Sequence, residues 1–428
     1  MNFLDELTWR GLRHQVTDEA VARQAFSGQT SAYIGFDPSG SSLHVGSLLP
    51  ILNLRRLQLA GHKPIALVGG GTGMIGDPSG KSQERNLLTE ADLRANAEGI
   101  RQQLTGFLDF EGPCAATVVD NLDWLGGAGL LTFLRDVGKH FSVNAMVQRD
   151  SVRNRLERSE QGISFTEFSY MLLQAYDFSI LYRDHGCQGQ LGGSDQWGNI
   201  VSGIDLIRRN GHTAAAPFGV TSPLITSRAG TKFGKTEEGN VWLDPARTSP
   251  YAFFQFWINT DDAEVGPYLR YFTFLAREEI EALEQAHAQA PHQRLAQRRL
   301  ADELTRLVHG ALGLEQAERA TRILFTGEVQ GVDSATLTEI FADVPSATLA
   351  EADLAATDWA LRTWLVGPGL PFASNGEAKK ALRAGSVRIN GEVPGAELGD
   401  GYGRDRLIDG QLAVIKVGKK RYWLAQLA

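Results

Sequence analysis

The sequence predicts an α/β protein, in which a domain with a parallel sheet is followed by an α-helical domain and a small α+β domain. Short apolar runs alternate with helical stretches over the first half of the chain, which is typical of a parallel sheet covered by helices. After about Pro250 the pattern changes to charged helices with one apolar face, and the chain ends in short apolar runs separated by turns. A length of 428 residues allows two or three such domains.

The parallel sheet is predicted from two strands and the helix between them. Ala32–Phe36 and Pro64–Val68 are short apolar runs, each followed by a glycine-rich turn. Leu48–Ala60 lies between them and has helical periodicity. A strand, a helix and a second strand in this order form the unit from which parallel sheets are built.

Two charged helices predict the helical domain. The first is Glu278–Ala288. The second has one apolar face, made of Leu295, Leu300, Leu304, Leu307 and Val308. The domain is expected to end near Phe325, and the weakly patterned stretch 327–345 is the predicted linker.

The tail is predicted to hold two hairpins. Asn390–Gly391 follows the apolar run Val387–Ile389, and Asn-Gly is the strongest short signal for a turn into a second strand. Leu412–Val417 is expected to turn at residues 418–420 into Tyr422–Leu424. These short strands, with the helices expected before them, predict the small α+β domain.

Charge and cysteine content restrict the class of protein. From Ser374 onward ten Lys and Arg stand against six Asp and Glu, so the tail carries +4 and the rest of the chain −12. A basic end on an acidic body indicates a polyanion-binding module, with a merely solvated surface as the alternative. Cys114 and Cys187 lie far apart and form no CxxC, so we expect no disulfide framework, no zinc site and a reducing cytoplasm. The acidic start of the chain does not resemble a signal peptide, and no apolar run approaches the roughly 20 residues that span a bilayer.

Two glycine patterns near residue 75 point to nucleotide sites that they do not fit. Residues 71–76 match GxGxxG after a strand, but a dinucleotide site needs a helix to begin there, and the turn sequence Asp77–Gly80 follows instead. Gly80–Ser82 resembles the end of a P-loop, but Ile75 stands where that motif needs a glycine. What remains is a turn that presents Asp77, followed by a basic segment.

Two further segments offer groups that suit an anion. Residues 35–47 run from a strand end to a helix N-terminus, where Gly46 allows close approach and Ser39 and His44 supply donors. Residues 231–236 place two lysines on a glycine-containing loop. The basic residues of this loop and of the segment after Asp77 are Lys81, Arg85, Lys232 and Lys235.

Together these segments resemble the HIGH and KMSKS signatures of class I aminoacyl-tRNA synthetases, and in particular the bacterial tyrosyl enzymes. The resemblance is carried, in order, by residues 35–38, 76–81, 133–144, 164–171, 192–199 and 232–236. It implies a Rossmann-like catalytic domain over 1–220, a KMSKS-type loop with the α-helical domain over 221–325, a linker over 326–350 and a C-terminal RNA-binding domain over 351–428. The chain departs from the HIGH signature at its last position, where the shorter Ser47 alters the contact to the ATP ribose. Pro50 is expected in the first turn of the helix that follows, where its missing N–H does no harm.

The reaction implied by the resemblance is attack of an amino-acid carboxylate on the α-phosphorus of ATP, followed by transfer of the amino acid to a tRNA. The nucleophile is already an anion, so catalysis needs positioning and charge stabilisation rather than a general base. The residues expected to act on the phosphates are Ser39, His44, Lys81, Arg85, Lys232 and Lys235. Mg²⁺ is expected to arrive with ATP, with no tightly bound cofactor and no metal site in the protein.

The predicted helix 166–181 carries a polar line on an otherwise apolar surface. Tyr170, Gln174 and Asp177 are spaced by four and three residues, so they share one face. Because buried polar groups need partners, this line marks either a satisfied core network or a binding site.

In the resembled family this line belongs to the tyrosine pocket. The resemblance implies that Tyr170 and Gln174, with Asp77, receive the ammonium group, and that Asp177 and Tyr33 bind the phenol hydroxyl. The full expected set for tyrosine is Tyr33, Asp77, Tyr170, Gln174, Asp177 and Gln196. The set expected for ATP and the adenylate is Asp37, Gly46, Ser47, Gly193, Asp195, Lys232 and Lys235.

The resemblance also implies partners. Lys379, Lys380 and Arg383 are expected to bind RNA. Residues 133–144 match the segment that forms a homodimer contact in the family, although their apolar side chains would serve equally as internal core. The expected partners are therefore L-tyrosine, ATP, tRNA and a second copy of the chain, in the cytoplasm and without a membrane.

Three other functions stay open on the sequence. A tryptophanyl synthetase shares the fold and both signatures, but its pocket has no need of the Asp177–Tyr33 pair. A small-molecule adenylyltransferase has no need of a basic tail. An RNA-binding or splicing protein with a synthetase fold would not need Lys232, Lys235, His44 or Asp177.

Overall fold

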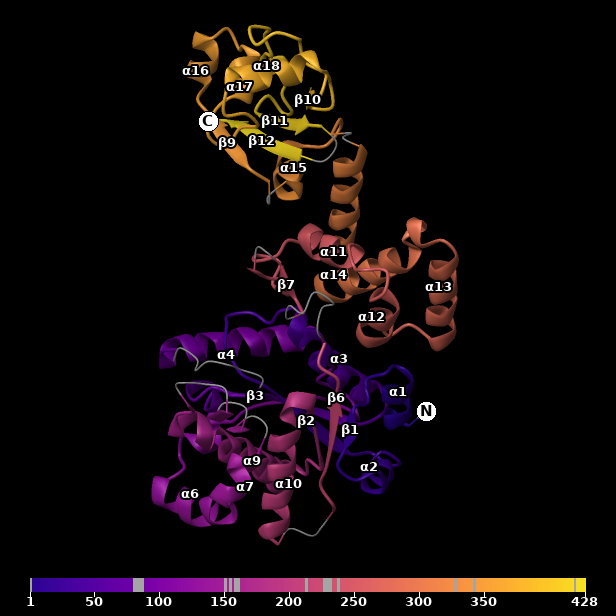
Figure 1. Cartoon of the computed structure of the whole chain (residues 1–428), viewed down its shortest axis with the longest axis vertical. Coiled ribbons are helices and arrows are strands. Elements are labelled where there is room, and N and C mark those ends of the chain that lie inside the picture. The colour runs from indigo at the N-terminus through magenta and orange to yellow at the C-terminus, as the bar shows by residue number, and fades with distance from the viewer. Residues whose placement is uncertain are drawn as a thin grey trace. The chain divides into compact units, whose positions relative to one another are not determined.

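The computed structural model describes residues 2–79, 88–149, 152–153, 156–157, 162–211, 215–225, 233–236, 239–326, 329–341, 344–418 and 421–428. The chain divides into two compact units, and Figure 1 labels helices and strands of both. The first consists of Met1–Arg247 with Thr260–Leu300, and the second of Thr248–Asn259 with Ala301–Ala428. Over the described ranges, no helix is long and apolar enough to cross a membrane.

The first unit is built on a six-stranded sheet in the order β1-β6-β5-β2-β3-β4. Its strands are β1 (Gln15–Val16), β2 (Ser31–Phe36), β3 (Lys63–Val68), β4 (Thr117–Asp120), β5 (Gly189–Gly193) and β6 (Phe218–Ser222). Neighbouring strands are parallel except for β1, which runs antiparallel to β6. The two strands predicted from apolar runs are confirmed as β2 and β3, which pair directly with Tyr33 opposite Ile65.

Helices of the first unit lie on both faces of this sheet. From β2 the chain passes through α3 to β3, and from β5 it passes through α10 to β6, on the other side of the sheet's centre. Since such crossovers are right-handed, the two helices lie on opposite faces. The α-helices of the unit are α1 (Phe3–Trp9), α2 (Glu19–Ala25), α3 (Val45–Leu59), α4 (Glu90–Thr105), α5 (Leu122–Leu125), α6 (Leu130–Asp136), α7 (Val143–Val147), α9 (Phe165–His185), α10 (Trp197–Arg209), α12 (Val265–Phe272) and α13 (Arg277–Gln289).

Helix α9 confirms the helix predicted over 166–181. The Ser164 side chain accepts from the Glu167 N–H at the start, and Gly186, with φ of 63°, ends the helix. The apolar side chains Phe178 and Leu181 pack with Tyr33 and Ile65 of the sheet in one buried cluster. The sheet therefore fixes which face of α9 turns inward.

Helix α3 begins earlier than the sequence predicts. It starts at Val45 with His44 as its cap, so Pro50 is its sixth residue and lies beyond the first turn. The expectation that Pro50 is harmless in the first turn is wrong, because at this position the missing N–H removes the helical bond to the carbonyl of Gly46.

The second unit holds a four-stranded sheet in the order β10-β11-β12-β9. Its strands are β9 (Ser346–Leu349), β10 (Val387–Ile389), β11 (Leu412–Val417) and β12 (Arg421–Leu427). Its helices are α11 (Pro250–Ile258), the part of α14 (Leu295–Thr326) beyond Leu300, α15 (Ser334–Ile340), α16 (Glu351–Ala356), α17 (Leu361–Leu365) and α18 (Asn375–Arg383). A separate two-stranded sheet joins β7 (Lys235–Thr236) and β8 (Gly239–Asn240) in the first unit.

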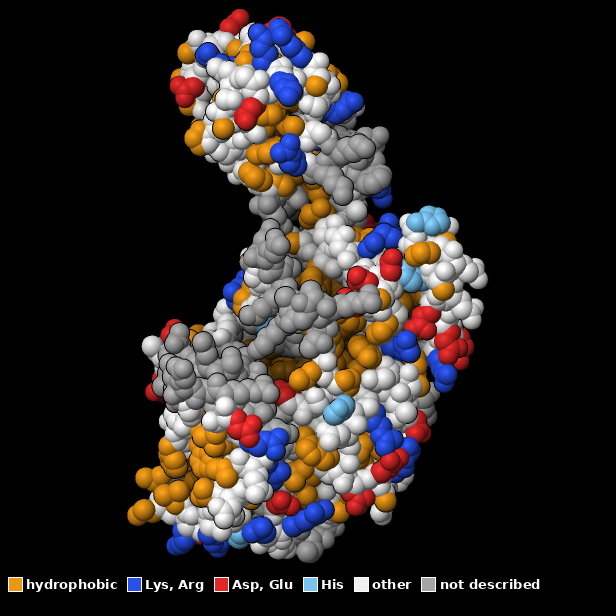
Figure 2. All heavy atoms as spheres, in the orientation of Figure 1, with side chains coloured by type: hydrophobic (Ala, Val, Ile, Leu, Met, Phe, Trp, Pro, Cys, Tyr) orange, Lys and Arg blue, Asp and Glu red, His pale blue; other side chains and the backbone are white. Residues whose placement is uncertain are grey.

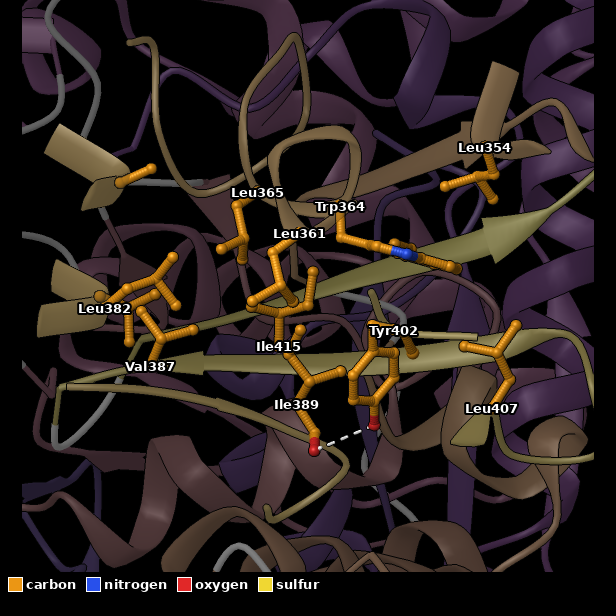
Figure 3. Close-up of a cluster of buried hydrophobic side chains, with 14 of the residues drawn as sticks. Leu354, Leu361, Trp364, Leu365, Leu382, Val387, Ile389, Tyr402, Leu407 and Ile415 are labelled. Atoms are coloured by element: carbon orange, nitrogen blue, oxygen red, sulfur yellow. Dashed lines mark hydrogen bonds between the residues drawn. The ribbon is translucent and has the colours of Figure 1, made fainter. Parts of the chain in front are cut away.

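Side chains alternate between two cores on either side of the second sheet. Ile415 and Val417 of β11 face Trp364 and Leu382 of α17 and α18, in a cluster where the Tyr402 hydroxyl donates to the Ile389 carbonyl at 3.3 Å (Figure 3). Leu412 and Val414 of the same strand belong to a second cluster with the end of α14 and with α15. Because successive side chains of β11 point to opposite faces of the sheet, the strand contributes side chains to both cores.

One of the two predicted hairpins is wrong. Asn390 and Gly391 do adopt the positive φ values of a tight turn, 50° and 85°, but the chain after them forms only a single bridge, from Ile389 to Glu392. The partner of β10 is instead β11, which begins at Leu412. The predicted turn from Leu412–Val417 into Tyr422–Leu424 is confirmed by the antiparallel pairing of β11 and β12.

Predicted boundaries between domains can be compared with the two units. The helices predicted at 278–288 and from Leu295 are present as α13 and α14, and α14 has a non-helical residue at Gly310. Strand β9 lies within the range 326–350, where a linker is expected, and it pairs in parallel with β12. The four predicted ranges remain an interpretation of the sequence.

Candidate active site

The centre of the first sheet provides the position for a site. From β2 and β5, which are adjacent and parallel, the chain continues to opposite sides of the sheet. Open parallel sheets bind ligands beyond the carboxyl ends of the strands at such a reversal. Asp37 follows β2 directly and Ser194 follows β5, so several predicted site residues lie at this edge.

The polar line on α9 reaches the end of β2. The Tyr170 hydroxyl donates to Asp37 Oδ2 at 3.0 Å, and Thr72 Oγ1 donates to Asp37 Oδ1 at 2.9 Å. Burial, with the nearby Asp37 carboxylate, holds the pKa of Tyr170 well above its usual value. Tyr170 is therefore neutral and acts as a hydrogen-bond donor.

Asp177 lies about two helical turns beyond Tyr170 on α9 and is fully buried. Asn121 Nδ2 donates to its Oδ2 at 2.9 Å, and Trp124 Nε1 donates to its Oδ1 at 2.7 Å. Burial raises the pKa of Asp177 to about 7, against the opposing effect of these two donors. Because Asn121 also donates to Thr72 Oγ1 at 2.9 Å, one chain of hydrogen bonds joins Asp37 to Asp177.

Tyr33 faces the same region from β2. Its side chain is 1% exposed and packs on Phe178 with ring centroids 5.3 Å apart. Burial, together with the Asp177 carboxylate, raises its pKa well above the usual value. Among the described residues its hydroxyl has no hydrogen-bond partner, although a buried hydroxyl without one typically costs about 1–3 kcal/mol. A polar ligand atom beside Tyr33 and Asp177 would supply the missing bond.

An amide network forms the other part of the polar line. Gln196 Nε2 donates to Asp77 Oδ2 at 2.8 Å, and Gln174 Nε2 donates to Gln196 Oε1 at 3.2 Å. Asn199 of α10 donates to Gln174 Oε1 at 2.9 Å. Asp77 is also held by the Ser79 N–H at 2.8 Å, so the carboxylate has a defined orientation at the edge of the site.

The helix that carries the HIGH-type segment begins beside this region. His44 Nδ1 accepts from the Gly46 N–H at 2.9 Å, so neutral His44 carries its proton on Nε2, where it can donate to an anion. The Ser47 N–H bonds the His44 carbonyl at 2.7 Å. Ser39 is exposed on the turn after Asp37. The cap leaves the N-terminus of α3 suited to phosphate groups.

A cavity of about 340 Å³ opens between the N-terminal part of α3 and the ends of β5 and β6. Its lining includes Gly46, Pro50, Gly193, Asp195, Ser222 and Phe233. Burial, with the nearby Asp77 carboxylate, raises the pKa of Asp195. Of the residues predicted for ATP, Gly46, Gly193 and Asp195 line this cavity, whereas Asp37 is held by Tyr170 and Thr72.

Some predicted residues cannot be placed in the site. Lys81, Arg85 and Lys232 lie outside the described residues, and Lys235 is described only through its place in β7. The predicted RNA-binding residues belong to α18 of the second unit, where Lys379 and Arg383 pair with Glu397 at 3.5 and 2.8 Å.

Four residues of the hydrogen-bond network were not predicted: Thr72, Asn121, Trp124 and Asn199. Asn121 follows the last residue of β4, and a polar residue at the carboxyl end of a strand is a signal that sequence reading could have used. Trp124 lies on a short helix without a polar line, and no sequence pattern marks it. Asn199 is the last residue of the 192–199 motif, a signal that sequence reading could have used.

Comparison with known proteins agrees with the fold. A family model for tRNA synthetases class I (W and Y) matches residues 25–326, and a model for a tyrosine–tRNA ligase C-terminal domain matches residues 336–425. The tyrosine–tRNA ligase of Roseiflexus castenholzii is 52% identical over 99% of both chains, and that of Geobacillus stearothermophilus is 49% identical over 100% of both. A solved C-terminally truncated mitochondrial tyrosyl-tRNA synthetase of Aspergillus nidulans aligns with a TM-score of 0.68 and 32% identity over 76% of this chain and 94% of that one. The chain therefore belongs to the tyrosyl-tRNA synthetase family of class I.

Proposed function

We propose that this protein activates L-tyrosine with ATP, forming tyrosyl-adenylate and pyrophosphate, and then transfers the tyrosine to the 3′ end of its tRNA. The observation that carries the proposal is the buried pair of Asp177 and Tyr33, in a chain about half identical to tyrosine–tRNA ligases over its full length. An indole ring has no phenol hydroxyl to match this pair, which favours tyrosine over tryptophan.

In this proposal the tyrosine side chain enters between β2 and α9. Its phenol hydroxyl donates to Asp177 and meets the hydroxyl of Tyr33. Its ammonium group is received by Asp77, Tyr170 and Gln174. The Asn121 and Trp124 bonds support this role for Asp177, because they hold the carboxylate in one orientation and leave lone pairs for a ligand. Gln196 contacts the substrate from the end of β5.

ATP is proposed to lie along the cavity at α3. Asp195 and Gly193 contact the adenylate ribose, and Asp37 lies in the nucleotide half of the site. The α3 N-terminus with Gly46 and Ser47 faces the phosphates. Ser39, His44, Lys81, Arg85, Lys232 and Lys235 stabilise the charge that grows on the leaving pyrophosphate.

Mg²⁺ is proposed to enter as part of the nucleotide substrate. Among the residues that the structure describes, no three His, Cys, Asp or Glu side chains gather as a metal-ligand group. Mg²⁺ commonly keeps several waters and binds through substrate phosphates, which is the arrangement we propose.

The second unit is proposed to bind tRNA through Lys379, Lys380 and Arg383. Its C-terminal part matches the domain model of tyrosine–tRNA ligases, and the tail carries a net charge of +4. Phosphate contacts from Lys and Arg supply most of the sequence-independent affinity for RNA. Since tRNA and ATP are the proposed substrates of the protein, we propose that it is located in the cytoplasm.

A homodimer is proposed through the surface around α6 and α7. Phe133 and Phe141 pack inward, but Leu130 and Leu131 are 72% and 81% exposed, and Phe165 is 77% exposed. Figure 2 shows hydrophobic side chains gathered on the surface over α6. Exposed apolar side chains of this kind support burial against a second copy.

Pyrophosphate exchange into ATP, repeated with each of the twenty amino acids, tests the activity. We expect exchange with tyrosine and little with phenylalanine or tryptophan. Charging of tRNA with labelled tyrosine then tests the transfer step. Exchange with tryptophan in preference to tyrosine would show that the substrate is wrong, and exchange without tRNA charging would show that the second step is wrong.

A further inference from the structure

Phe233 packs on two aromatic side chains of α12. Its ring is stacked on Phe272, with centroids 5.3 Å apart and planes inclined by 15°, and it meets Tyr268 edge-on at 5.3 Å. Tyr268 and Phe272 also contact each other at 5.7 Å. Phe272 is fully buried and Tyr268 is 6% exposed, so the three rings form one aromatic cluster.

The residue after Phe233 lies directly on the N-terminus of α3. Gly234 has φ of 83°, and a Cβ at this position would lie 2.5 Å from Cγ2 of Val45. The Val241 N–H donates to the Gly234 carbonyl, and the Val45 N–H donates to the Val241 carbonyl, both at 3.0 Å. Gly234 and Val241 are therefore fixed on the helix end that we propose for the ATP phosphates.

Helix α12 itself is bonded to α3. Arg56 of α3 and Arg10 both donate to the carbonyl of Thr273, at 3.2 and 3.0 Å, just beyond the end of α12. The negative end of the helix dipole and its free carbonyls favour two buried guanidinium groups here. Arg56 also donates to Asn53, which donates to Ser222 at the end of β6. The aromatic cluster thus rests on a support that is continuous with the walls of the cavity.

We propose that Phe272 and Tyr268 are positioning residues for the ATP step, because they hold Phe233 and Gly234 against the N-terminus of α3. Neither is among the described residues that line the cavity, whereas Phe233 and Gly46 both line it. They therefore act on the nucleotide only through Phe233. Lys232 and Lys235, proposed for the phosphates, are one and two residues from Phe233 in the sequence. This inference rests on the proposed function, since it assigns the cavity to ATP.

The test compares Phe272→Leu and Phe233→Leu, singly and together, with a matched control. Phe26→Leu is the control, because Phe26 is also buried in an aromatic cluster of the first unit, with Phe3, His62 and Phe218. Tyr268→Phe keeps the ring and should behave as the parent. Exchange kinetics are measured with ATP varied at saturating tyrosine and with tyrosine varied at saturating ATP, and the thermal midpoint is recorded for each variant.

Each single Leu variant at positions 233 and 272 should lower kcat/KM for ATP by about twofold to tenfold, the factor expected for one aromatic pair. The KM for tyrosine should stay at the parental value. The double variant should fall no further than the lower single, because both changes break the same contact. Phe26→Leu should lose thermal stability without changing kcat/KM for ATP.

Equal losses for ATP and tyrosine, an additive double variant, or the same ATP defect in Phe26→Leu would each overturn the proposal. Where Phe272→Leu does not fold, Tyr268→Leu keeps the test decisive, because it breaks the other aromatic contact of Phe233 and should give the same ATP defect. A parent without tyrosine-dependent exchange would refute the proposed function instead, and the two failures are thereby distinguished.

Discussion

Trp124 and Asp177 are joined by a hydrogen bond of 2.7 Å from the indole N–H to Oδ1, across 53 residues of sequence. Asn121 donates to the other oxygen of the same carboxylate. Burial of the carboxylate disfavours its charged form, whereas these two donors favour it. Burial is the larger effect, and the pKa of Asp177 rises to about 7. A group with this pKa changes its charge near neutral pH, so the effect of its two donors can be tested by varying the pH.

Replacing Trp124 by Phe should shift the pH dependence of tyrosine binding. The charged carboxylate of Asp177 accepts a hydrogen bond from the phenol hydroxyl more strongly than the protonated form does. The KM for tyrosine should therefore rise as the pH falls through about 7. Losing the Trp124 donor should move this rise upward by about one pH unit. The measurement is the KM for tyrosine between pH 6 and 9, with the KM for ATP as an internal reference. Trp9→Phe is the control, because it removes an indole hydrogen bond to Glu6 and should not change the pH profile of the KM for tyrosine. An unshifted profile in Trp124→Phe would contradict the assignment of Asp177 to the phenol hydroxyl.

Replacing Tyr33 by Phe should weaken selection without weakening the fold. In the absence of ligand the Tyr33 hydroxyl has no partner among the described residues, so its removal should leave the free energy of unfolding unchanged or slightly increased. The ratio of exchange efficiencies for tyrosine and phenylalanine should fall by about twofold to tenfold, the value of one neutral bond. Urea unfolding and exchange with both amino acids are the measurements. A large loss of stability with an unchanged ratio of tyrosine to phenylalanine exchange would show that the phenol hydroxyl is not bound at Tyr33.

Removing the C-terminal part should separate the two steps of the reaction. A chain that ends near Pro345 would keep Leu337 and Ile340 of α15, and Phe341 after it, without the strands β11 and β12 that cover them. A chain that ends at Thr326 avoids most of this exposed surface. We expect it to retain tyrosine-dependent exchange and to charge tRNA poorly, because the basic tail is gone. The truncated Aspergillus nidulans relative, which was crystallised, supports folding of such a chain. Full charging by the shortened chain would show that the tail is only a charged surface.

Acid should destabilise the first unit through His62. This side chain is buried among Phe3 and Phe26, and burial lowers its pKa below the ordinary value of 6.5. The unfolded chain therefore binds the proton more readily than the folded one. Stability is fully present above pH 6.5 and decreases as pH falls toward the lowered pKa of the folded state. Thermal midpoints between pH 7.5 and 5 should fall less in His62→Phe than in the parent, whereas His185→Phe, at the exposed end of α9, should follow the parent.

The sequence alone determined the elements with a strong local period. Strands β2 and β3 were readable because they are short apolar runs between glycine-rich turns. Helix α9 was readable because its polar residues recur at four and three positions on an apolar surface. The order of the short motifs also gave the family, because each motif is a contiguous stretch whose chemistry does not depend on distant residues.

Only the tertiary structure decided which distant groups meet. Asn121 and Thr72 complete the network around Asp177 from the ends of other strands, 56 and 105 positions away in the sequence, and no local period encodes such a contact. Asn390 and Gly391 adopt the turn conformation that their residue types favour, but β10 pairs with β11 rather than with the chain after the turn. Strand pairing depends on which neighbouring strand buries the apolar face of the sheet, and the local sequence does not encode this. Strand β9 is likewise stabilised by β12 rather than by its own weak pattern. Phe233 belongs to a motif that the sequence displays, but its support on α12 exists only where the folded chain brings rings from two distant segments together.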